Sequence, residues 1–135
     1  MNKVRHLTFC ILGEPASKSN SRRLVSIRGK PAFIKSKKAI EYLKLFNQQC
    51  PNPDEKFTED VRVDIIIYYA SRRPDLDESV ILDAMQGKVY QNDRQVKQKR
   101  IYWGLDKDNP RAIINVSPVN EDDFPDYLEK SLTAD

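Results

Sequence analysis

Three of the four aspartates within residues 72–96 are spaced in a way that suits a divalent metal ion, and the fourth, Asp83, either joins them or is solvated. Asp75 and Asp77 flank Leu76, and Asp93 follows after a short amphipathic segment. If the chain is extended there, alternate side chains point the same way, so the two acids share a face and the leucine points toward the core. Two close carboxylates resist joint ionisation unless a cation lies between them. Mg²⁺ is the expected cation, with Mn²⁺ as an alternative, because Mg²⁺ prefers oxygen ligands and takes one or two carboxylates plus substrate phosphates.

A second interpretation of the Asp75–Asp77 pair needs no metal. Aspartate is common in turns and at helix caps, so the pair alone fits either role. Arg72 and Arg73 come before the pair, and Asp93 can return to it after a helical excursion of about three turns. These neighbours favour the metal interpretation, and we therefore predict that the three aspartates form a catalytic metal site.

The charged residues of the chain are concentrated in separate segments. The net charge is +3, with basic residues dominating 14–44 and 94–100 and acidic residues dominating from 121 onward. This distribution is typical of a phosphate-binding protein, although clustering on a solvated surface also produces charge runs. Arginine and lysine bind phosphates in ways that set position and affinity rather than sequence choice. The candidate contacts to a DNA backbone are Lys18, Arg22, Arg23, Arg72, Arg73 and Lys97.

Three short motifs in a fixed order resemble those of the RusA-like Holliday junction resolvases. They are Arg-Pro-Asp-Leu-Asp at 73–77, Ile-Leu-Asp-Ala-Met-Gln-Gly-Lys-Val-Tyr at 81–90 and Asn-Asp-Arg-Gln-Val at 92–96. That family consists of small, often phage-encoded, Mg²⁺-dependent endonucleases that act as homodimers on four-way DNA junctions in recombination and repair. The resemblance implies the same activity, a RusA-like fold and a bacterial or phage origin. It also carries the family's acidic ligands over to the three aspartates named above.

Two departures from the family pattern lie close to these acids. Relatives commonly carry a lysine about one turn after the second aspartate, but this chain is shorter there and has the apolar residues Val80, Ile81 and Leu82. The position before the third ligand, often acidic in relatives, is Asn92. The missing lysine motivates a second hypothesis, a non-catalytic DNA-binding protein of the same fold. A third hypothesis is a metal-dependent nuclease that acts on other branched DNA or on RNA.

The composition excludes several other classes of protein. A length of 135 residues supports one domain over residues 1–135, and 39% hydrophobic residues can build a core. No apolar run is long enough to span a membrane, the N-terminus is too polar for a signal peptide, and no Gly-rich loop indicates a nucleotide cofactor. Cys10 and Cys50 lie far apart and outside any CxxC motif, so a reducing cytoplasm is the expected location.

The hydrophobic pattern predicts an α+β fold in which a mixed β-sheet has helices packed against it. Val61–Tyr69 has one apolar face, and Ile66 and Tyr68 add apolar bulk to the other, so this segment is expected to be a central strand. The acidic pair follows its C-terminal end, where sites on open sheets tend to form. The other predicted elements are strands at Val4–Leu12, Gln95–Gly104 and Arg111–Val116, the last two paired as a hairpin through Leu105–Pro110; helices at Ser36–Gln49, Glu78–Gln86 and Asp122–Leu132; a basic loop at 14–30 with a strand or hairpin arm at Arg28–Ile34; and an acidic tail from about residue 120.

Overall fold

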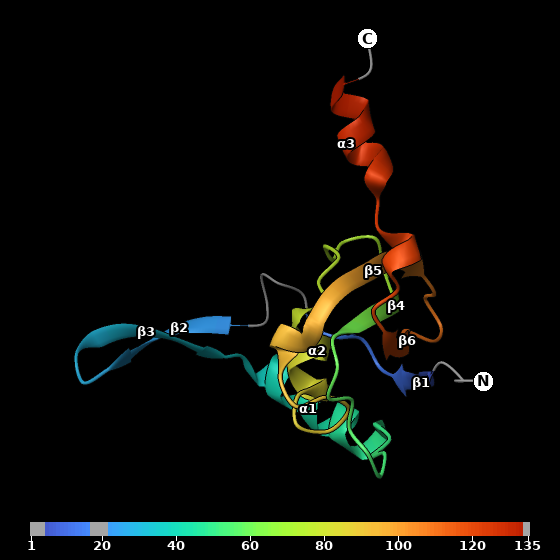
Figure 1. Ribbon diagram of the computed structural model, residues 1–135. Coiled ribbons are helices and arrows are strands. Elements are labelled where there is room, and N and C mark those ends of the chain that lie inside the picture. Colours follow the sequence, from blue (N-terminus) through green and yellow to red (C-terminus); the bar gives the residue numbers. More distant parts are fainter. Residues whose placement is uncertain (1–4, 17–21, 134–135) are drawn as a thin grey trace.

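A four-stranded sheet in the order β1-β6-β4-β5 forms the centre of the molecule (Figure 1). The structure is a computed structural model that describes residues 5–16 and 22–133. β4 pairs in parallel with β5 and antiparallel with β6, and β6 pairs antiparallel with β1. The predicted mixed sheet and α+β fold are therefore confirmed. The strands are β1 (Leu7–Leu12), β4 (Val61–Tyr69), β5 (Val96–Leu105) and β6 (Arg111–Pro118).

One face of β4 lies at the centre of the hydrophobic core, which confirms that this strand is central. Helices α1 (Lys37–Gln49) and α2 (Ser79–Met85) contribute buried side chains to the same core. α1 begins as predicted, because the Ser36 hydroxyl accepts a hydrogen bond from the N–H of Ala39 at 3.2 Å. The residues of β4 that alternate onto this face are each at most 1% exposed: Val61, Val63, Ile65, Ile67 and Tyr69.

The opposite face of the sheet carries a network of paired charges. The Asp64 carboxylate on β4 accepts hydrogen bonds from Arg62 at 3.1 Å and from Arg100 at 2.8 Å. Burial alone would raise the pKa of Asp64, but the hydrogen bonds from the two arginines outweigh it and lower that pKa below its ordinary value. Arg62 also pairs with Asp123, which ties the 3₁₀ turn η3 (Glu121–Asp123) to the sheet.

The predicted hairpin of the last two strands is wrong, because β4 lies between β5 and β6. The connection at 106–110 has to cross the end of β4, a distance of two strand spacings or about 10 Å, which five residues can span. The N–H of Asp106 donates to the carbonyl of Tyr69 at 2.9 Å, so the connection is fixed to the end of β4 as it passes. The Asp106 carboxylate accepts hydrogen bonds from the N–H groups of Asp108 and Asn109, which stabilises the bend of the connection.

The basic loop predicted at 14–30 is wrong over its second half. Residues Arg22–Ile27 form strand β2, which pairs antiparallel with β3 (Lys30–Lys35). Arg28 and Gly29 join the strands with positive φ angles of 52° and 78°, the pattern of a type I′ hairpin turn. The hairpin projects from the body as a two-stranded ribbon (Figure 1).

A terminal helix, α3 (Asp126–Thr133), confirms the prediction for the C-terminal segment. It also projects from the body, in a different direction from the hairpin (Figure 1). All of its residues are exposed. No helix within residues 5–16 and 22–133 is long and apolar enough to cross a membrane.

Candidate functional site

The segment at 70–78, which contains the acidic pair, leaves the C-terminal end of β4 and folds back along β5. Trp103 Nε1 on β5 donates a hydrogen bond to the carbonyl of Pro74 at 3.1 Å. Further down the same strand, Lys99 Nζ forms an ion pair with Glu78 at 2.7 Å. Alternate residues of β5 therefore hold both halves of the segment against the sheet, which fixes where its aspartates lie.

The hydroxyl group of Tyr69 forms hydrogen bonds with the backbone of both members of the acidic pair. Its oxygen accepts a hydrogen bond from the N–H of Asp77 at 3.2 Å, and the hydroxyl donates to the carbonyl of Asp75 at 3.2 Å. The tyrosine is fully buried, and its ring stacks on Trp103 with 5.7 Å between ring centroids. Burial raises the pKa of Tyr69 and outweighs the hydrogen bond with the backbone of Asp77, which lowers it. The hydroxyl therefore keeps its proton and can act as donor and acceptor at once.

The side chain of Asp77 is buried, with 7% of the residue exposed. Its Oδ1 accepts a hydrogen bond from the N–H of Ser79, the first residue of α2, at 3.0 Å, so the turn role considered for the pair is present; the N-cap of α2 is Glu78, which makes no side-chain cap hydrogen bond. Its Oδ2 is buried and has no hydrogen-bond partner in the structure. A buried carboxylate oxygen without a partner is costly, and a hard cation would satisfy it. Asp77 thus fits a Mg²⁺ ligand.

The prediction that Leu76 points into the core is wrong. Leu76 is 37% exposed, whereas Asp77 is buried and Asp75 is exposed. The side chain of Asp77 turns inward because its carboxylate binds the first free N–H of α2, and the leucine is displaced outward. The two acids flank the same tyrosine hydroxyl, but their carboxylates lie in different surroundings.

Asp93 lies at the other end of α2 from Asp77. Its N–H donates to Oε1 of Gln86, which directly follows α2, at 3.1 Å. Asp93 begins the 3₁₀ turn η2 (Asp93–Gln95), which a reciprocal capping box between Asn92 and Gln95 stabilises. Seven residues of helix span about 10 Å. Within the described residues, no three or more Asp, Glu, His or Cys side chains gather closely enough to hold a metal ion. The role of the three aspartates as a ligand set stays a prediction.

A groove beside the acidic segment contains residues that the sequence did not single out. Lys38 from α1 and Arg73 line it together with Glu14, Glu41 and Pro74. The negative charge of Glu14 contributes to the raised pKa of the Tyr69 hydroxyl. The sequence feature that could have identified Lys38 is its position in the first turn of a predicted helix, where a positive charge is unfavourable beside the helix dipole.

The predicted DNA contacts do not all lie together. Arg22 and Lys35, a cross-strand pair at the base of the hairpin, line a small hollow with Ser79 and Asp83 of α2. This hollow places two positive charges beside the helix that follows the acidic pair. Lys18 lies outside the described residues. The other predicted contacts are exposed, on β2, in the acidic segment and at the start of β5: Arg23, Arg72, Arg73 and Lys97.

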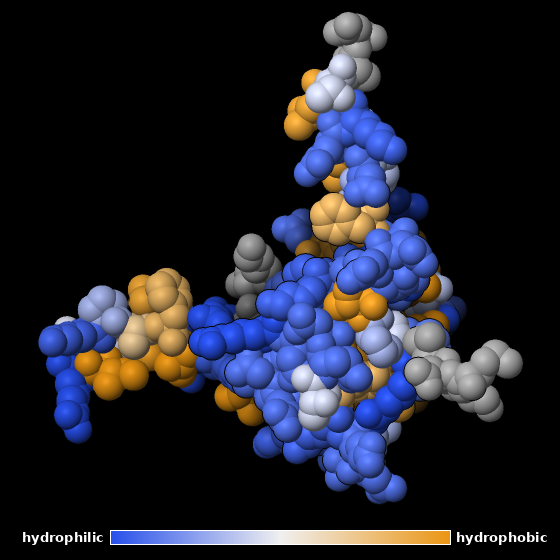
Figure 2. Space-filling model, viewed as in Figure 1, coloured by the Kyte–Doolittle hydropathy of each residue, from blue (hydrophilic) through white to orange (hydrophobic). Residues whose placement is uncertain are grey.

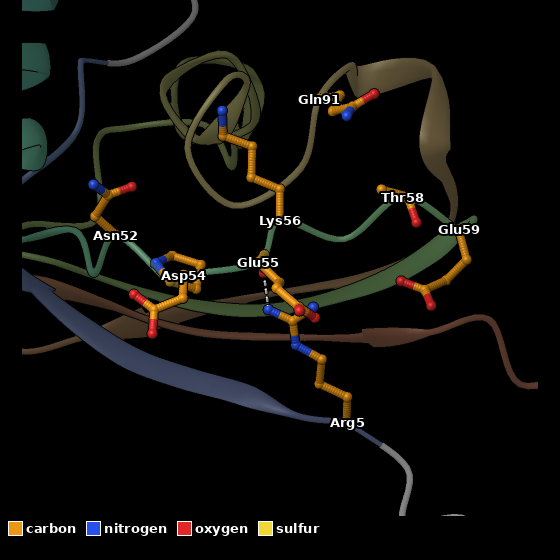
Figure 3. A pocket seen from close by; sticks show the side chains of 9 residues that line it. Arg5, Asn52, Asp54, Glu55, Lys56, Thr58, Glu59 and Gln91 are labelled. Atoms are coloured by element: carbon orange, nitrogen blue, oxygen red, sulfur yellow. Dashed lines mark hydrogen bonds between the residues drawn. The ribbon is translucent and has the colours of Figure 1, made fainter.

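A separate hollow lies around the segment before β4 (Figure 3). Its lining mixes both signs of charge, and none of the predicted metal ligands or DNA contacts belongs to it. The guanidinium of Arg5 lies 4.2 Å from the centre of the Phe57 ring and donates to the carbonyl of Glu55. Arg5 thus serves to hold this segment against the body.

Comparison with protein families gives one match that covers most of the chain. A family model described as "Endodeoxyribonuclease RusA" matches residues 13–117, more than three quarters of the 135 residues. The chain belongs to the RusA endodeoxyribonuclease family. The RusA match includes the hairpin, the acidic segment and all three aspartates, and it ends before α3. It confirms the family inferred from the motifs. A search of curated proteins gave no match.

Proposed function

We propose that this RusA-family chain is a Mg²⁺-dependent endonuclease that cuts four-way DNA junctions by paired nicking, in recombination and repair. The family is one of endodeoxyribonucleases, which supports phosphodiester hydrolysis of DNA. The observation that carries the metal part of the proposal is Asp77, whose buried Oδ2 has no hydrogen-bond partner among the described residues. A divalent cation beside this oxygen would remove the cost of leaving it unpaired.

In this proposal, Asp77 and Asp75 are the first ligands of the ion, and Asp93 is a further ligand. Because Mg²⁺ keeps several waters and takes one or two carboxylates, the pair beside Tyr69 would be enough to hold one ion. When bound, the ion activates a water as nucleophile and stabilises the charge that develops on the leaving oxygen. The tyrosine contributes by fixing the backbone at both acids, through hydrogen bonds of 3.2 Å.

Positive side chains around the acidic segment are proposed to hold the DNA backbone. Lys38 and Arg73 line the groove beside Pro74, and Arg22 and Lys35 flank α2 on another side. Such contacts position phosphates, so binding should weaken steeply as the salt concentration rises. We further propose that the chain acts as a homodimer, since a resolvase needs two sites to nick two strands of a junction.

The test is cleavage of a labelled four-way junction, compared with a linear duplex, a flap and an RNA hairpin. The proposal predicts junction cutting that needs Mg²⁺, stops with EDTA and disappears in Asp75→Asn while junction binding remains. Asp108→Asn is the matched control, since Asp108 lies in the turn after β5 and uses only its backbone N–H there. If the protein cuts the flap or the RNA hairpin in preference to the junction, the four-way junction is not its substrate and the preferred nucleic acid is.

One observation favours a second candidate, a DNA-binding protein without nuclease activity. In the described residues, the predicted ligands are not gathered into a group of three. The residues that follow Asp77 also lack the lysine found in relatives. This candidate predicts salt-sensitive junction binding with no cutting in either Mg²⁺ or Mn²⁺. That outcome in the same assay would refute the enzymatic proposal.

A further inference from the structure

The hairpin of β2 and β3 exposes apolar side chains that no residue in the described part of the chain covers. Leu24 and Phe33 face each other across the two strands and are 61% and 71% exposed. Ile27 next to the turn is 51% exposed, and no described residue of the hairpin is buried. Figure 2 shows the apolar surface along this arm. A lone two-stranded hairpin is marginally stable in water, so this arm needs a surface to pack against.

The C-terminal arm has the same property. One apolar stripe begins two residues before α3 and continues along the helix. Its members follow helical spacing: Phe124, Tyr127, Leu128 and Leu132. Their exposed fractions range from 57% to 87%, and α3 has no buried residue. Figure 2 shows apolar side chains on this arm as well. Exposed apolar surface on two projecting elements indicates interaction sites rather than ordinary surface.

The charges of the two arms are opposite. Residues 22–35 of the hairpin contain five basic residues and no acid: Arg22, Arg23, Arg28, Lys30 and Lys35. Residues 121–133 of the C-terminal arm contain five acids and one base, Lys130, and one of the acids, Asp123, already pairs with Arg62. The acids are Glu121, Asp122, Asp123, Asp126 and Glu129. An apolar ribbon with a basic rim and an apolar helix stripe with an acidic rim are complementary in both hydrophobicity and charge.

We propose that two copies of this chain form a symmetric dimer in which the hairpin of one protomer packs against α3 of its partner, and the reverse. The proposal rests on the homodimer of the proposed function and names its contact surfaces. The arms leave the body in different directions (Figure 1), so they do not meet within one chain. A two-fold axis that runs between them places each hairpin beside the partner's helix, and the contact is then made twice.

The area available is consistent with a stable interface. At their exposed fractions, Phe33, Phe124 and Tyr127 can each bury on the order of 100 Å². Made twice, with the exposed leucines of both arms added, the contact approaches the roughly 1,200 Å² at which stable interfaces begin. The open face of the sheet is a weaker candidate, because Asp64 there already pairs with its neighbouring arginines. DNA is a weaker candidate for the partner of the hairpin, because its phosphates would pair with the basic side chains but would leave the ring of Phe33 exposed to water.

The first experiment is a charge exchange followed by sedimentation velocity, without DNA, over a range of protein concentrations. Reversal of the hairpin charges in Arg28→Glu/Lys30→Glu should weaken the dimer roughly tenfold or more, and so should Asp126→Lys/Glu129→Lys in the helix. The two changes combined in one chain should restore most of the dimer. A monomeric wild-type protein, or a dimer that none of these changes affects, would overturn the proposal.

The second experiment locates the contact directly. In a background with Cys10→Ser and Cys50→Ser, Phe33→Cys protein is mixed with Leu128→Cys protein and treated with a short thiol cross-linker. The mixture should give a covalent dimer, whereas either protein alone should not. Cross-linking in each protein alone, or none in the mixture, would contradict hairpin-to-helix packing.

These outcomes separate the arm exchange from the nuclease proposal. If the dimer resists every change in the arms while Mg²⁺-dependent junction cutting persists, the arm exchange is wrong and the nuclease proposal stands. If the arms cross-link as expected but no junction is cut, the arm exchange stands and the nuclease proposal is wrong. A third result, loss of junction binding by Leu24→Ser/Phe33→Ser with an unchanged dimer, would assign the hairpin to DNA and overturn the exchange.

Discussion

Replacement of Tyr69 by phenylalanine tests how the acidic pair is held. The substitution removes one oxygen atom and keeps the ring, so the stack on Trp103 at 5.7 Å survives. What is lost is the pair of hydrogen bonds of 3.2 Å to the backbone of Asp75 and Asp77. The N–H of Asp77 then has no partner at a buried position.

The magnitude follows from these two hydrogen bonds. Each net hydrogen bond contributes about 0.5–1.5 kcal/mol, and a buried N–H left without a partner costs about 1–3 kcal/mol. Because the carbonyl of the exposed Asp75 can turn to water, the cost should come mainly from Asp77. We expect Tyr69→Phe to lower the free energy of unfolding by about 1–3 kcal/mol. It should also slow junction cutting, because the backbone at both acids is no longer fixed.

Tyr42→Phe is a matched control for this prediction. Tyr42 is buried too, with 2% exposed, but its hydroxyl makes no hydrogen bond in the structure. Its removal should therefore be neutral or slightly stabilising. Both variants are compared by chemical denaturation and by cutting rate. Equal losses of stability in the two variants, or full activity in Tyr69→Phe, would refute the assigned role of the Tyr69 hydroxyl.

Three further substitutions test other parts of the structure. Trp103→Phe removes the donor to the Pro74 carbonyl and should cost about 1 kcal/mol of unfolding free energy; no measurable change would argue against that anchor. Gly104→Ala places a Cβ 2.7 Å from the Tyr68 ring and should cost about 1–3 kcal/mol by denaturation; a neutral result would mean that the ring moves freely. Since the pKa of Asp64 is lowered in the folded state, its ion pairs stabilise the fold above its unfolded-state pKa of about 3.9, and this stability is lost as pH falls through the folded value. Asp64→Asn should flatten the acid side of a stability–pH profile, and an unchanged slope would contradict the pairing.

The secondary-structure predictions were correct where a local sequence pattern is compatible with only one structure. The alternation of β4 could bury a face only as a central strand, and Ser36 before an amphipathic segment could only cap a helix. The predictions failed where a local pattern is compatible with two structures. A five-residue connection at 106–110 suits a hairpin, yet the same length crosses the end of β4 once that strand inserts between β5 and β6. Insertion of a distant strand leaves no local signal.

The sequence nominated residue types for a candidate site, and their role stays a prediction; it did not indicate their geometry. The spacing singled out Asp75 and Asp77, but whether Asp77 turns inward depends on the free N–H groups of α2 and on the distant Tyr69 hydroxyl. Lys38 and Glu14 reach the same groove from separate elements, which no spacing within the acidic segment could indicate.

Titration calorimetry of Mg²⁺ into the metal-free protein, its Asp77→Asn variant and the Asp108→Asn control tests the central claim most directly. The account predicts saturable binding to the wild type and to the control, and an affinity lower by about tenfold or more in Asp77→Asn, because the unpaired buried oxygen would be a ligand of the ion. Equal Mg²⁺ binding by all three proteins, or none by the wild type, would contradict a metal site at Asp77.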